Sequence, residues 1–234
     1  MKKYNNEKAI ISLTSWVKRI SFVSKTIYNL LTICPGFHIV LTLSEEEFPN
    51  KMNDLPEDLL LFVENDLIEI LWVKENYKSF KKWLFTAQKY PKVPIITADD
   101  DCIYFENYAE TLYNNWLNSK NKNTFISYYV NYIDNIPHLG GACTLYPPNI
   151  FNDIGINLLI KSKIYKITNQ DDDFYTALRK LLNLTTAKCV GNYKKLYCFH
   201  DEISPCHNEL RKMSNLTRKK RLNQIFNLVK ESNF

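Results

Sequence analysis

The first part of the chain alternates between short apolar runs and longer stretches in which apolar residues recur every three or four positions. Runs of the first kind predict strands, and stretches of the second kind predict helices. Strands are expected over residues 9–14, 37–43, 67–73 and 93–98, and helices over residues 19–32, 56–65 and 77–90. Because this alternation is typical of βαβ units, the pattern predicts an α/β fold with a largely parallel sheet.

The pattern is less regular after residue 98. Helices are expected over residues 104–118, 149–156 and 170–182, and strands over residues 124–130 and 142–146, with one or two short strands within 188–196. A Gly140-Gly141 turn precedes one of these strands, and the tail from Asn208 has a helical pattern. At 234 residues the chain can bury a sizeable core, and we expect a single domain.

The composition is that of an ordinary globular protein, with 45% hydrophobic and 24% charged residues. The net charge of +5 is mild, and its positive excess lies in the tail, at Arg211, Lys212, Arg218, Lys219, Lys220 and Arg221. Nucleic-acid readers usually spread basic residues along a face that follows the phosphates. A basic tail on a nearly neutral body therefore predicts no nucleic-acid partner.

Cysteine usage and the N-terminus indicate a cytoplasmic protein. The six cysteines are scattered without CxxC spacing, and residues 1–16 have no apolar stretch typical of a signal peptide. We therefore expect reduced thiols. No run approaches the roughly 18 to 20 apolar residues of a membrane span, so any membrane contact is expected to be peripheral.

Three consecutive carboxylates, Asp99-Asp100-Asp101, directly follow the expected strand at 93–98. Ligands of open α/β sheets bind outside the carboxyl ends of the strands. Adjacent carboxylates repel one another in a partly dehydrated pocket, whereas Mg²⁺ or Mn²⁺ binds their oxygens and keeps positions for phosphates. In an extended loop Asp99 and Asp101 can converge on one ion while Asp100 faces elsewhere. The alternative is that these aspartates cap the helix expected from Tyr104.

The segment from Ile95 to Asp101 resembles the DXD motif of GT-A glycosyltransferases, and further segments are similar to one bacterial group within that fold. Those segments are residues 11–16 (ISLTSW), 18–20 (KRI), 43–49 (LSEEEFP), 78–82 (KSFKK), 140–148 (GGACTLYPP) and 171–175 (DDDFY). The resemblance implies a GT-A, Rossmann-like fold in which helices flank a central, mostly parallel sheet. It also implies sugar transfer from a nucleotide-sugar donor to a glycan or lipid-linked acceptor, as in lipopolysaccharide or capsule biosynthesis.

In proteins of this kind the residues after the first strand usually cradle the nucleotide. The resemblance therefore implies donor contacts from Thr14, Ser15, Trp16 and Arg19. The alternatives are a buried aromatic residue for Trp16 and a solvated helix start for Arg19.

The resemblance further implies a metal site and cationic donor contacts. The expected metal ligands are Asp99, Asp101 and a late histidine, His200, and Asp99 and Asp100 are also expected to contact the donor. Lys81, with Lys78 and Lys82, would add positive charge near the donor. The alternatives are a hydrogen-bonded structural role for His200 and a solvent-exposed face for the lysines.

Glycosyl transfer also requires an activated acceptor hydroxyl, which calls for a carboxylate within hydrogen-bond reach. Asp172 or Asp173 is the expected base, because the cluster Asp171-Asp172-Asp173 opens a predicted helix and can project into the cleft. A base there implies single displacement with inversion; without one, retention stays open. The alternative is that these aspartates only cap the helix.

The Gly140-Gly141 turn is the second feature expected on the acceptor or sugar side of the cleft. Neither residue has a side chain, so backbone can approach a ligand closely there. Tyr146, at the end of the following strand, is expected to be available for stacking. The alternative is a plain hairpin turn.

Within the single domain of residues 1–234 we expect a nucleotide-sugar-binding half at 1–130, an acceptor-side half at 131–207 and a basic helical tail at 208–234. The tail combines basic residues with an apolar stripe. Such a helix can rest on an anionic inner leaflet, where a lipid-linked acceptor would be presented. Docking on the protein's own surface is the alternative.

Two other classes of protein use acidic loops in similar places. A non-catalytic Ca²⁺- or carbohydrate-binding module is one, although the DxDxDG spacing of an EF-hand is absent. A metal-dependent nucleotidyltransferase is the other. Such enzymes usually carry a glycine-rich phosphate loop near the first strand, where this chain has Leu13-Thr14-Ser15-Trp16. Neither GxxxxGK[ST] nor GxGxxG occurs in the chain.

Overall fold

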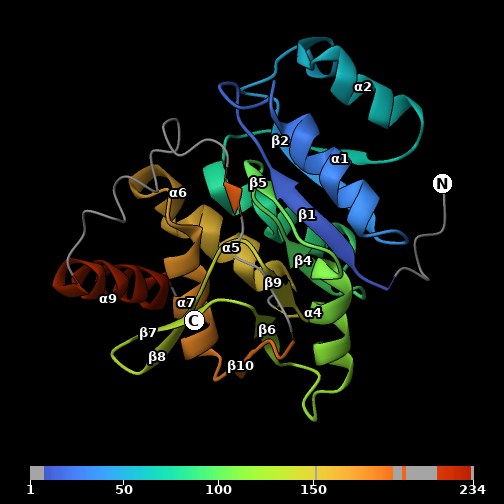
Figure 1. Cartoon of the computed structure of the whole chain (residues 1–234). Coiled ribbons are helices and arrows are strands. Elements are labelled where there is room, and N and C mark those ends of the chain that lie inside the picture. Colours follow the sequence, from blue (N-terminus) through green and yellow to red (C-terminus); the bar gives the residue numbers. More distant parts are fainter. Residues whose placement is uncertain (1–7, 151, 192–196, 199–214, 233–234) are drawn as a thin grey trace.

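A central seven-stranded sheet organises the protein, with strand order β10-β6-β9-β4-β1-β2-β3 (Figure 1). The computed structural model describes residues 8–150, 152–191, 197–198 and 215–232. The strands are β1 Ile10–Thr14, β2 His38–Ser44, β3 Glu69–Val73, β4 Ile95–Thr97, β6 Phe125–Ser127, β9 Thr144–Tyr146 and β10 Thr186–Lys188. All neighbours pair in parallel except β9, which is antiparallel to both β4 and β6. The expected α/β class with a mostly parallel sheet is confirmed.

Helices cover both faces of this sheet. They are α1 Val23–Ile33, α2 Glu57–Glu64, α3 Leu84–Lys89, α4 Tyr108–Leu117, α5 Asn152–Ser162, α6 Ile164–Ile167, α7 Asp171–Leu181 and α9 Asn215–Glu231, with short 3₁₀ turns η2 Lys51–Asp54 and η3 Lys78–Lys82. Helices α1 and α4 share one buried cluster with the sheet, and α3, α5 and α7 share another. The result is a three-layer α/β/α arrangement.

The strand β1 separates the two cores. Ile11 and Leu13 are buried with α1 on one face, whereas Ile10 is buried with α3 and α7 on the other. Because successive side chains of a strand point to opposite faces, a strand covered on both sides reads as a continuous apolar run. This is why residues 9–14 were recognisable as a strand.

Several expected helices begin later than predicted, and one of them breaks. The predicted helix at 77–90 is divided into η3 and α3 around Trp83, which is fully buried. The Lys82 carbonyl there accepts a hydrogen bond from Ser12 Oγ of β1 at 2.5 Å. The predicted helix at 104–118 begins at Tyr108 because Asn107 adopts a left-handed backbone conformation, with φ of 60°. Just before it, β5 (Cys102–Ile103) pairs with β11 (Tyr197–Cys198).

A β-hairpin that we did not predict follows β6. It consists of β7 (Val130–Ile133) and β8 (Ile136–Leu139), which pair in antiparallel fashion. The two turn residues, Asp134 and Asn135, have positive φ values of 50° and 61°. Two-residue hairpin turns require this conformation, and Asp and Asn tolerate it better than most residues. The Asp-Asn pair was therefore the available signal.

The basic tail forms α9, which packs against α7. Its apolar stripe is buried, since Leu222, Ile225 and Val229 are each at most 3% exposed. Lys219 of α9 also forms an ion pair with Asp134 in the hairpin turn, at 2.7 Å. The stripe thus docks on the protein's own surface, and membrane contact stays a prediction for the outward basic residues. None of the helices in the described part of the chain is long and apolar enough to span a bilayer.

We predict that Ile225→Ala lowers the free energy of unfolding by about 2 to 5 kcal/mol, because it removes a buried side chain between α9 and the body. Urea denaturation followed by circular dichroism measures this change. Lys220→Ala, on the exposed face of the same helix, serves as the control and should change stability little. Equal stability of the two variants would contradict the docking of α9.

Candidate functional site

A cavity of about 920 Å³ opens at the carboxyl edge of the sheet. Strands β1 and β4 end at this edge, and the antiparallel β9 begins there. The structure brings most of the expected site residues into the wall of this cavity: Thr14, Ser15, Trp16, Arg19, Lys81, Asp99, Asp100, Asp101, Asp172 and Asp173. His200 lies outside the described residues.

Buried hydrogen bonds hold the triple-aspartate loop. Thr26 of α1 donates from Oγ1 to the carbonyls of Asp100 and Cys102, at 3.0 and 2.9 Å. The backbone N–H of Asp99 donates to the hydroxyl of Tyr104 at 2.6 Å. The loop is therefore fixed by side chains beneath it, and its own carboxylates are left to face the cavity or its wall.

Asp100 faces the loop that follows β1. Its carboxylate accepts hydrogen bonds from Ser15 Oγ at 2.6 Å and from Arg19 Nη1 at 2.5 Å. The same Arg19 nitrogen lies 2.8 Å from Asp101 Oδ2. Arg19 is thus not a solvated helix start, because it pairs with two carboxylates of the loop. Contact between Arg19 and a donor stays a prediction.

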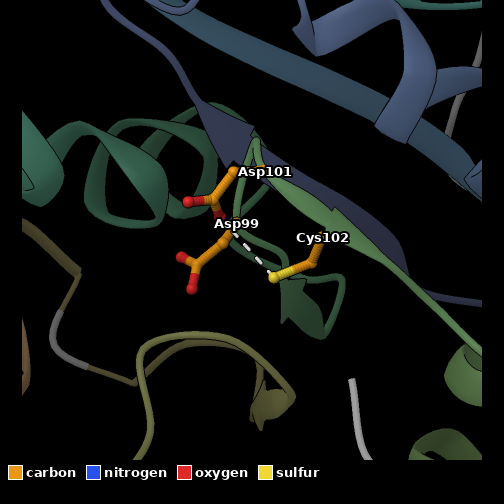
Figure 2. A group of neighbouring side chains, drawn as sticks. All are labelled: Asp99, Asp101 and Cys102. Carbon is orange, nitrogen blue, oxygen red and sulfur yellow. Dashed lines mark hydrogen bonds between the residues drawn. The ribbon is translucent and has the colours of Figure 1, made fainter. Parts of the chain in front are cut away.

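The other two aspartates lie together. Asp99 and Asp101, with Cys102, each bring one ligand atom into a group whose members lie within 4.8 Å of one another (Figure 2). The Cys102 thiol donates to Asp101 Oδ1 at 3.6 Å. Two carboxylates at this spacing fit a hard divalent cation such as Mg²⁺ or Mn²⁺, whereas a thiol is a softer ligand that suits these ions poorly.

Burial and mutual repulsion weaken the acidity of this loop. Burial raises the pKa of Asp100 to about 6, although Arg19 and Ser15 oppose the shift. Burial and the neighbouring Asp99 also raise the pKa of Asp101. A bound cation would lower both values again, because it favours the charged form of each carboxylate.

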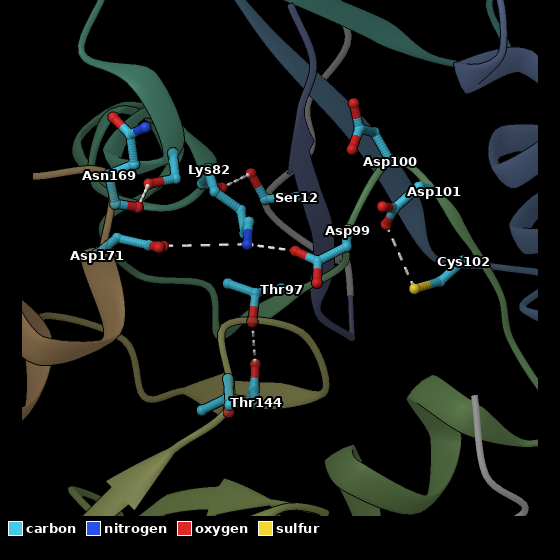
Figure 3. A network of polar contacts seen from close by, with 12 residues as sticks. Ser12, Lys82, Thr97, Asp99, Asp100, Asp101, Cys102, Thr144, Asn169 and Asp171 are labelled. Atoms are coloured by element: carbon cyan, nitrogen blue, oxygen red, sulfur yellow. Dashed lines mark hydrogen bonds and ion pairs between the residues drawn. The ribbon is translucent and has the colours of Figure 1, made fainter. Parts of the chain in front are cut away.

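Lys82 joins the two acidic clusters. Its ammonium donates to Asp99 and lies 3.9 Å from Asp171 Oδ2 (Figure 3). Burial lowers the pKa of Lys82, but the carboxylates of Asp99, Asp171 and Asp172 raise it by more than burial lowers it. The pKa of Lys82 therefore lies well above its ordinary value. The break at Trp83 ends the 3₁₀ turn that carries Lys82, so a lysine expected on a helix face is buried instead.

Lys81 points toward a different part of the wall. It is 1% exposed, and its ammonium donates to Glu47 Oε2 at 2.8 Å and to Asn76 Oδ1 at 3.1 Å. Burial lowers the pKa of Lys81, and Glu47 opposes this shift. Glu47 and Asn76 line the cavity, and we did not predict either of them. Contact between Lys81 and a donor stays a prediction.

The three aspartates that open α7 have distinct surroundings. Asp172 faces the cavity, and burial together with the adjacent Asp171 raises its pKa well above the ordinary value. Asp173 is 1% exposed and accepts hydrogen bonds from His138 Nε2 at 2.8 Å and Arg221 Nε at 2.5 Å. Gln170, at the N-cap position, makes no side-chain capping bond. Of the two candidate bases, Asp172 is partly exposed and Asp173 is almost fully buried, so Asp172 has more access to a ligand.

Gly141 allows the two clusters to approach each other. A Cβ at this position would lie 2.7 Å from Asp172 Oδ1 and 3.2 Å from Lys82 Nζ, whereas at Gly140 the nearest atoms are at 3.4 and 3.5 Å. The close backbone approach expected at this turn is therefore to protein side chains at the cavity wall.

Aromatic residues near the site behave differently from expectation in one case. Trp16 is partly exposed in the cavity wall, with the Lys18 ammonium 5.4 Å from its ring centroid. Tyr146, which we expected to stack on a ligand, is 1% exposed and stacks on Trp83 in the core, with centroids 4.1 Å apart. The prediction for Tyr146 was wrong, because the inward face of β9 points into the core.

The sequence reasoning also missed His138 and Arg221 as cavity residues. His138 lies on the unpredicted hairpin, and Arg221 was counted only as tail charge. The Asp134-Asn135 pair, which forms the hairpin turn, was the signal that would have drawn attention to the strand that carries His138.

Comparison with solved structures places this fold. A cytidylyltransferase from Leptospira borgpetersenii serovar Hardjo-bovis (strain JB197) aligns over 97% of each chain, with 10% identity and a TM-score of 0.52. TarS 1-349 from S. aureus aligns over 97% of this chain and 71% of its own, with 11% identity and a TM-score of 0.50. The galactosyltransferase LgtC, in complex with donor and acceptor sugar analogs, covers 96% of each chain at 10% identity and a TM-score of 0.49.

No protein-family model and no curated protein sequence matches the chain. The structural alignments establish a common fold, whereas identities near 10% leave the reaction open. The expected GT-A, Rossmann-like fold is confirmed.

Proposed function

We propose that this protein is a glycosyltransferase that moves a sugar from a nucleotide-sugar donor to a hydroxyl of a glycan or lipid-linked acceptor. One observation carries the proposal. Two aspartate clusters, from the end of β4 and the start of α7, face one cavity of about 920 Å³ at the ligand-binding edge of a GT-A fold. A cavity of that size can hold a nucleotide sugar together with part of an acceptor.

On the donor side, Asp99 and Asp101 are proposed to hold a Mg²⁺ or Mn²⁺ ion. The ion, when bound, would act as a Lewis acid that neutralises charge on the departing diphosphate. Arg19 supports this arrangement because it fixes the Asp101 carboxylate and binds Asp100. The segment Thr14-Ser15-Trp16 is proposed to contact the nucleotide from the neighbouring strand end.

On the acceptor side, the second cluster is proposed to receive the proton. Both Asp172 and Asp173 line the cavity, but Asp173 is 1% exposed and is hydrogen-bonded to His138, which lines the cavity as well. In either case the acceptor oxygen attacks the anomeric carbon as it loses its proton. The bond between the anomeric carbon and the donor's phosphate oxygen breaks on the opposite face of the carbon. Single displacement of this kind inverts the configuration of the sugar.

A metal-dependent nucleotidyltransferase is the second candidate function. Its supporting observation is the alignment with a cytidylyltransferase over 97% of each chain. Such an enzyme would bind a nucleoside triphosphate and release pyrophosphate, whereas a glycosyltransferase releases a nucleoside diphosphate or monophosphate. A Ca²⁺- or carbohydrate-binding module would bind neither kind of nucleotide.

We predict that one class of nucleotide sugar raises the melting temperature, and that this stabilisation requires Mn²⁺ or Mg²⁺. At a ligand concentration of 100 Kd the stabilisation corresponds to about 2.7 kcal/mol. A thermal-shift panel of UDP, GDP and CMP sugars, each with and without metal, measures this, with CTP and ATP as probes of the second candidate. Asp101→Asn should abolish the metal-dependent part.

The matched control is Asp58→Asn, since Asp58 lies in the first turn of α2 and not in the cavity wall. It should retain the full stabilisation. Stabilisation by triphosphates alone would favour the nucleotidyltransferase, and indifference to every nucleotide would overturn both enzymatic candidates.

We also predict that Gly141→Ala slows sugar transfer by about tenfold or more, while Gly140→Ala changes it little. The added methyl group at Gly141 must displace Asp172 or Lys82, which lie 2.7 and 3.2 Å from it. A shift of about 1 Å at a reacting geometry can cost up to 10²-fold in rate. Release of free nucleotide from the stabilising donor measures the effect. Equal rates in the two variants would contradict a role for the contact between the clusters.

A further inference from the structure

The cavity contains a histidine that is paired with a buried carboxylate. Asp173 accepts a hydrogen bond from His138 Nε2 at 2.8 Å on one oxygen and from Arg221 Nε at 2.5 Å on the other. These three residues come from the β7–β8 hairpin, the start of α7 and the helix α9. The arrangement therefore depends on three segments that are far apart in the sequence.

The second ring nitrogen of His138 is open to the cavity. The His138 side chain is 18% exposed and forms part of the cavity wall. Within the described residues, the ring makes its hydrogen bond to Asp173 through Nε2, and Nδ1 is not a buried atom that lacks a partner. Nδ1 is thus accessible to a ligand.

The pairing determines what this nitrogen can do. A carboxylate that accepts from Nε2–H holds the neutral ring in the tautomer whose Nδ1 carries a lone pair. The same carboxylate stabilises the imidazolium that forms when Nδ1 takes a proton. Arg221 provides the positive charge that a buried, ionised Asp173 requires. His138 therefore presents a supported proton acceptor to the cavity.

The hairpin keeps the ring in place. His138 lies opposite Asn131 in the β7–β8 pairing, and Arg179 of α7 donates to the carbonyl of the preceding Pro137 at 3.1 Å. Both contacts act on the backbone that carries the ring. A ring held from two sides loses little freedom when it binds a ligand.

Asp172 is placed differently. Its carboxylate lies beside Gly141 and shares the positive charge of Lys82 with Asp99 and Asp171. This position is next to the loop that is proposed to bind the donor. Both residues fall within residues 131–207, the half expected on the acceptor side, but His138 reaches the cavity from the β7–β8 hairpin and Asp172 from the start of α7.

We propose that His138, supported by Asp173, is the group that removes the proton from the acceptor hydroxyl. The proton passes to Nδ1, the oxygen's electron pair forms the bond to the anomeric carbon, and the bond to the leaving phosphate oxygen breaks with its electrons on that oxygen. This inference rests on the proposed function and selects one of its two routes. The charged groups of α7 and α9 that line the cavity with His138 are Asp171, Asp172, Asp173, Arg218 and Arg221, and Arg179 donates to the neighbouring Pro137 carbonyl.

The test compares His138→Ala with Asp172→Asn. The probe is the nucleotide sugar that stabilises the wild-type protein most, with water as the acceptor and release of free nucleotide as the signal. His138→Ala is expected to lower kcat about 10²- to 10⁴-fold with an unchanged KM for the donor. Added imidazole is expected to restore part of the rate, because it can enter the space that the ring leaves at the cavity wall. Asp172→Asn is expected to lose less activity and to show no rescue.

His38→Ala is the matched control, since His38 Nε2 also faces a carboxylate, Glu69 Oε2 at 3.3 Å, but lies outside the cavity wall. Its rate should not respond to imidazole. A near wild-type rate in His138→Ala would overturn the role of His138. So would a His138→Ala variant that binds the donor normally but is not rescued by imidazole, if Asp172→Asn is inactive.

A second measurement does not depend on activity. In ¹⁵N-correlated spectra of the histidine rings, wild-type protein is expected to show the His138 ring protonated on Nε2, and Asp173→Ala, which removes the acceptor, should abolish this preference. The opposite tautomer in the wild type would overturn the inference. If the wild-type protein binds a donor but the His138 variants behave like wild type, the inference fails and the proposed function stands. If the wild-type protein binds no nucleotide, the proposed function itself fails.

Discussion

The central constraint is electrostatic, because two clusters of aspartates share the wall of one partly buried cavity. Each carboxylate that leaves water there requires a positive partner or takes up a proton. Arg19 pairs with Asp100 and Asp101, and Lys82 lies between Asp99 and Asp171. Burial nevertheless raises the pKa of Asp100 to about 6, against the opposing effect of Arg19. A divalent cation that binds two of these carboxylates would complete the compensation.

The fold determines where that charge gathers. Parallel β1 and β4 end at the same edge, and antiparallel β9 brings Gly141 to this edge from the opposite direction. Because residue 141 has no side chain, Asp172 and Lys82 can lie directly against the backbone. The hairpin β7–β8 and the helix α9 add His138 and Arg221 to the cavity wall. The fold thus places the first aspartate cluster in the same cavity wall as His138 and Arg221.

Much of the sheet and the first acidic cluster could be predicted from the sequence, because buried parallel strands are continuous apolar runs and Asp99 follows one of them directly. Other features depended on tertiary contacts. The inward orientation of Tyr146, the separation of Lys81 from Lys82 and the pairing of His138 with Asp173 each arise between segments distant in sequence. Helical periodicity also could not reveal that the predicted helix over residues 77–90 is interrupted at the buried Trp83.

The most direct test of this account is anomalous diffraction from a crystal soaked with Mn²⁺ and UDP, or with the nucleotide of whichever donor binds best. The account predicts a manganese peak at about 2.0 to 2.6 Å from one oxygen of Asp99 and one of Asp101, with diphosphate oxygens completing its coordination. A bound nucleotide without manganese at these carboxylates, or manganese bound elsewhere in the protein, would contradict it.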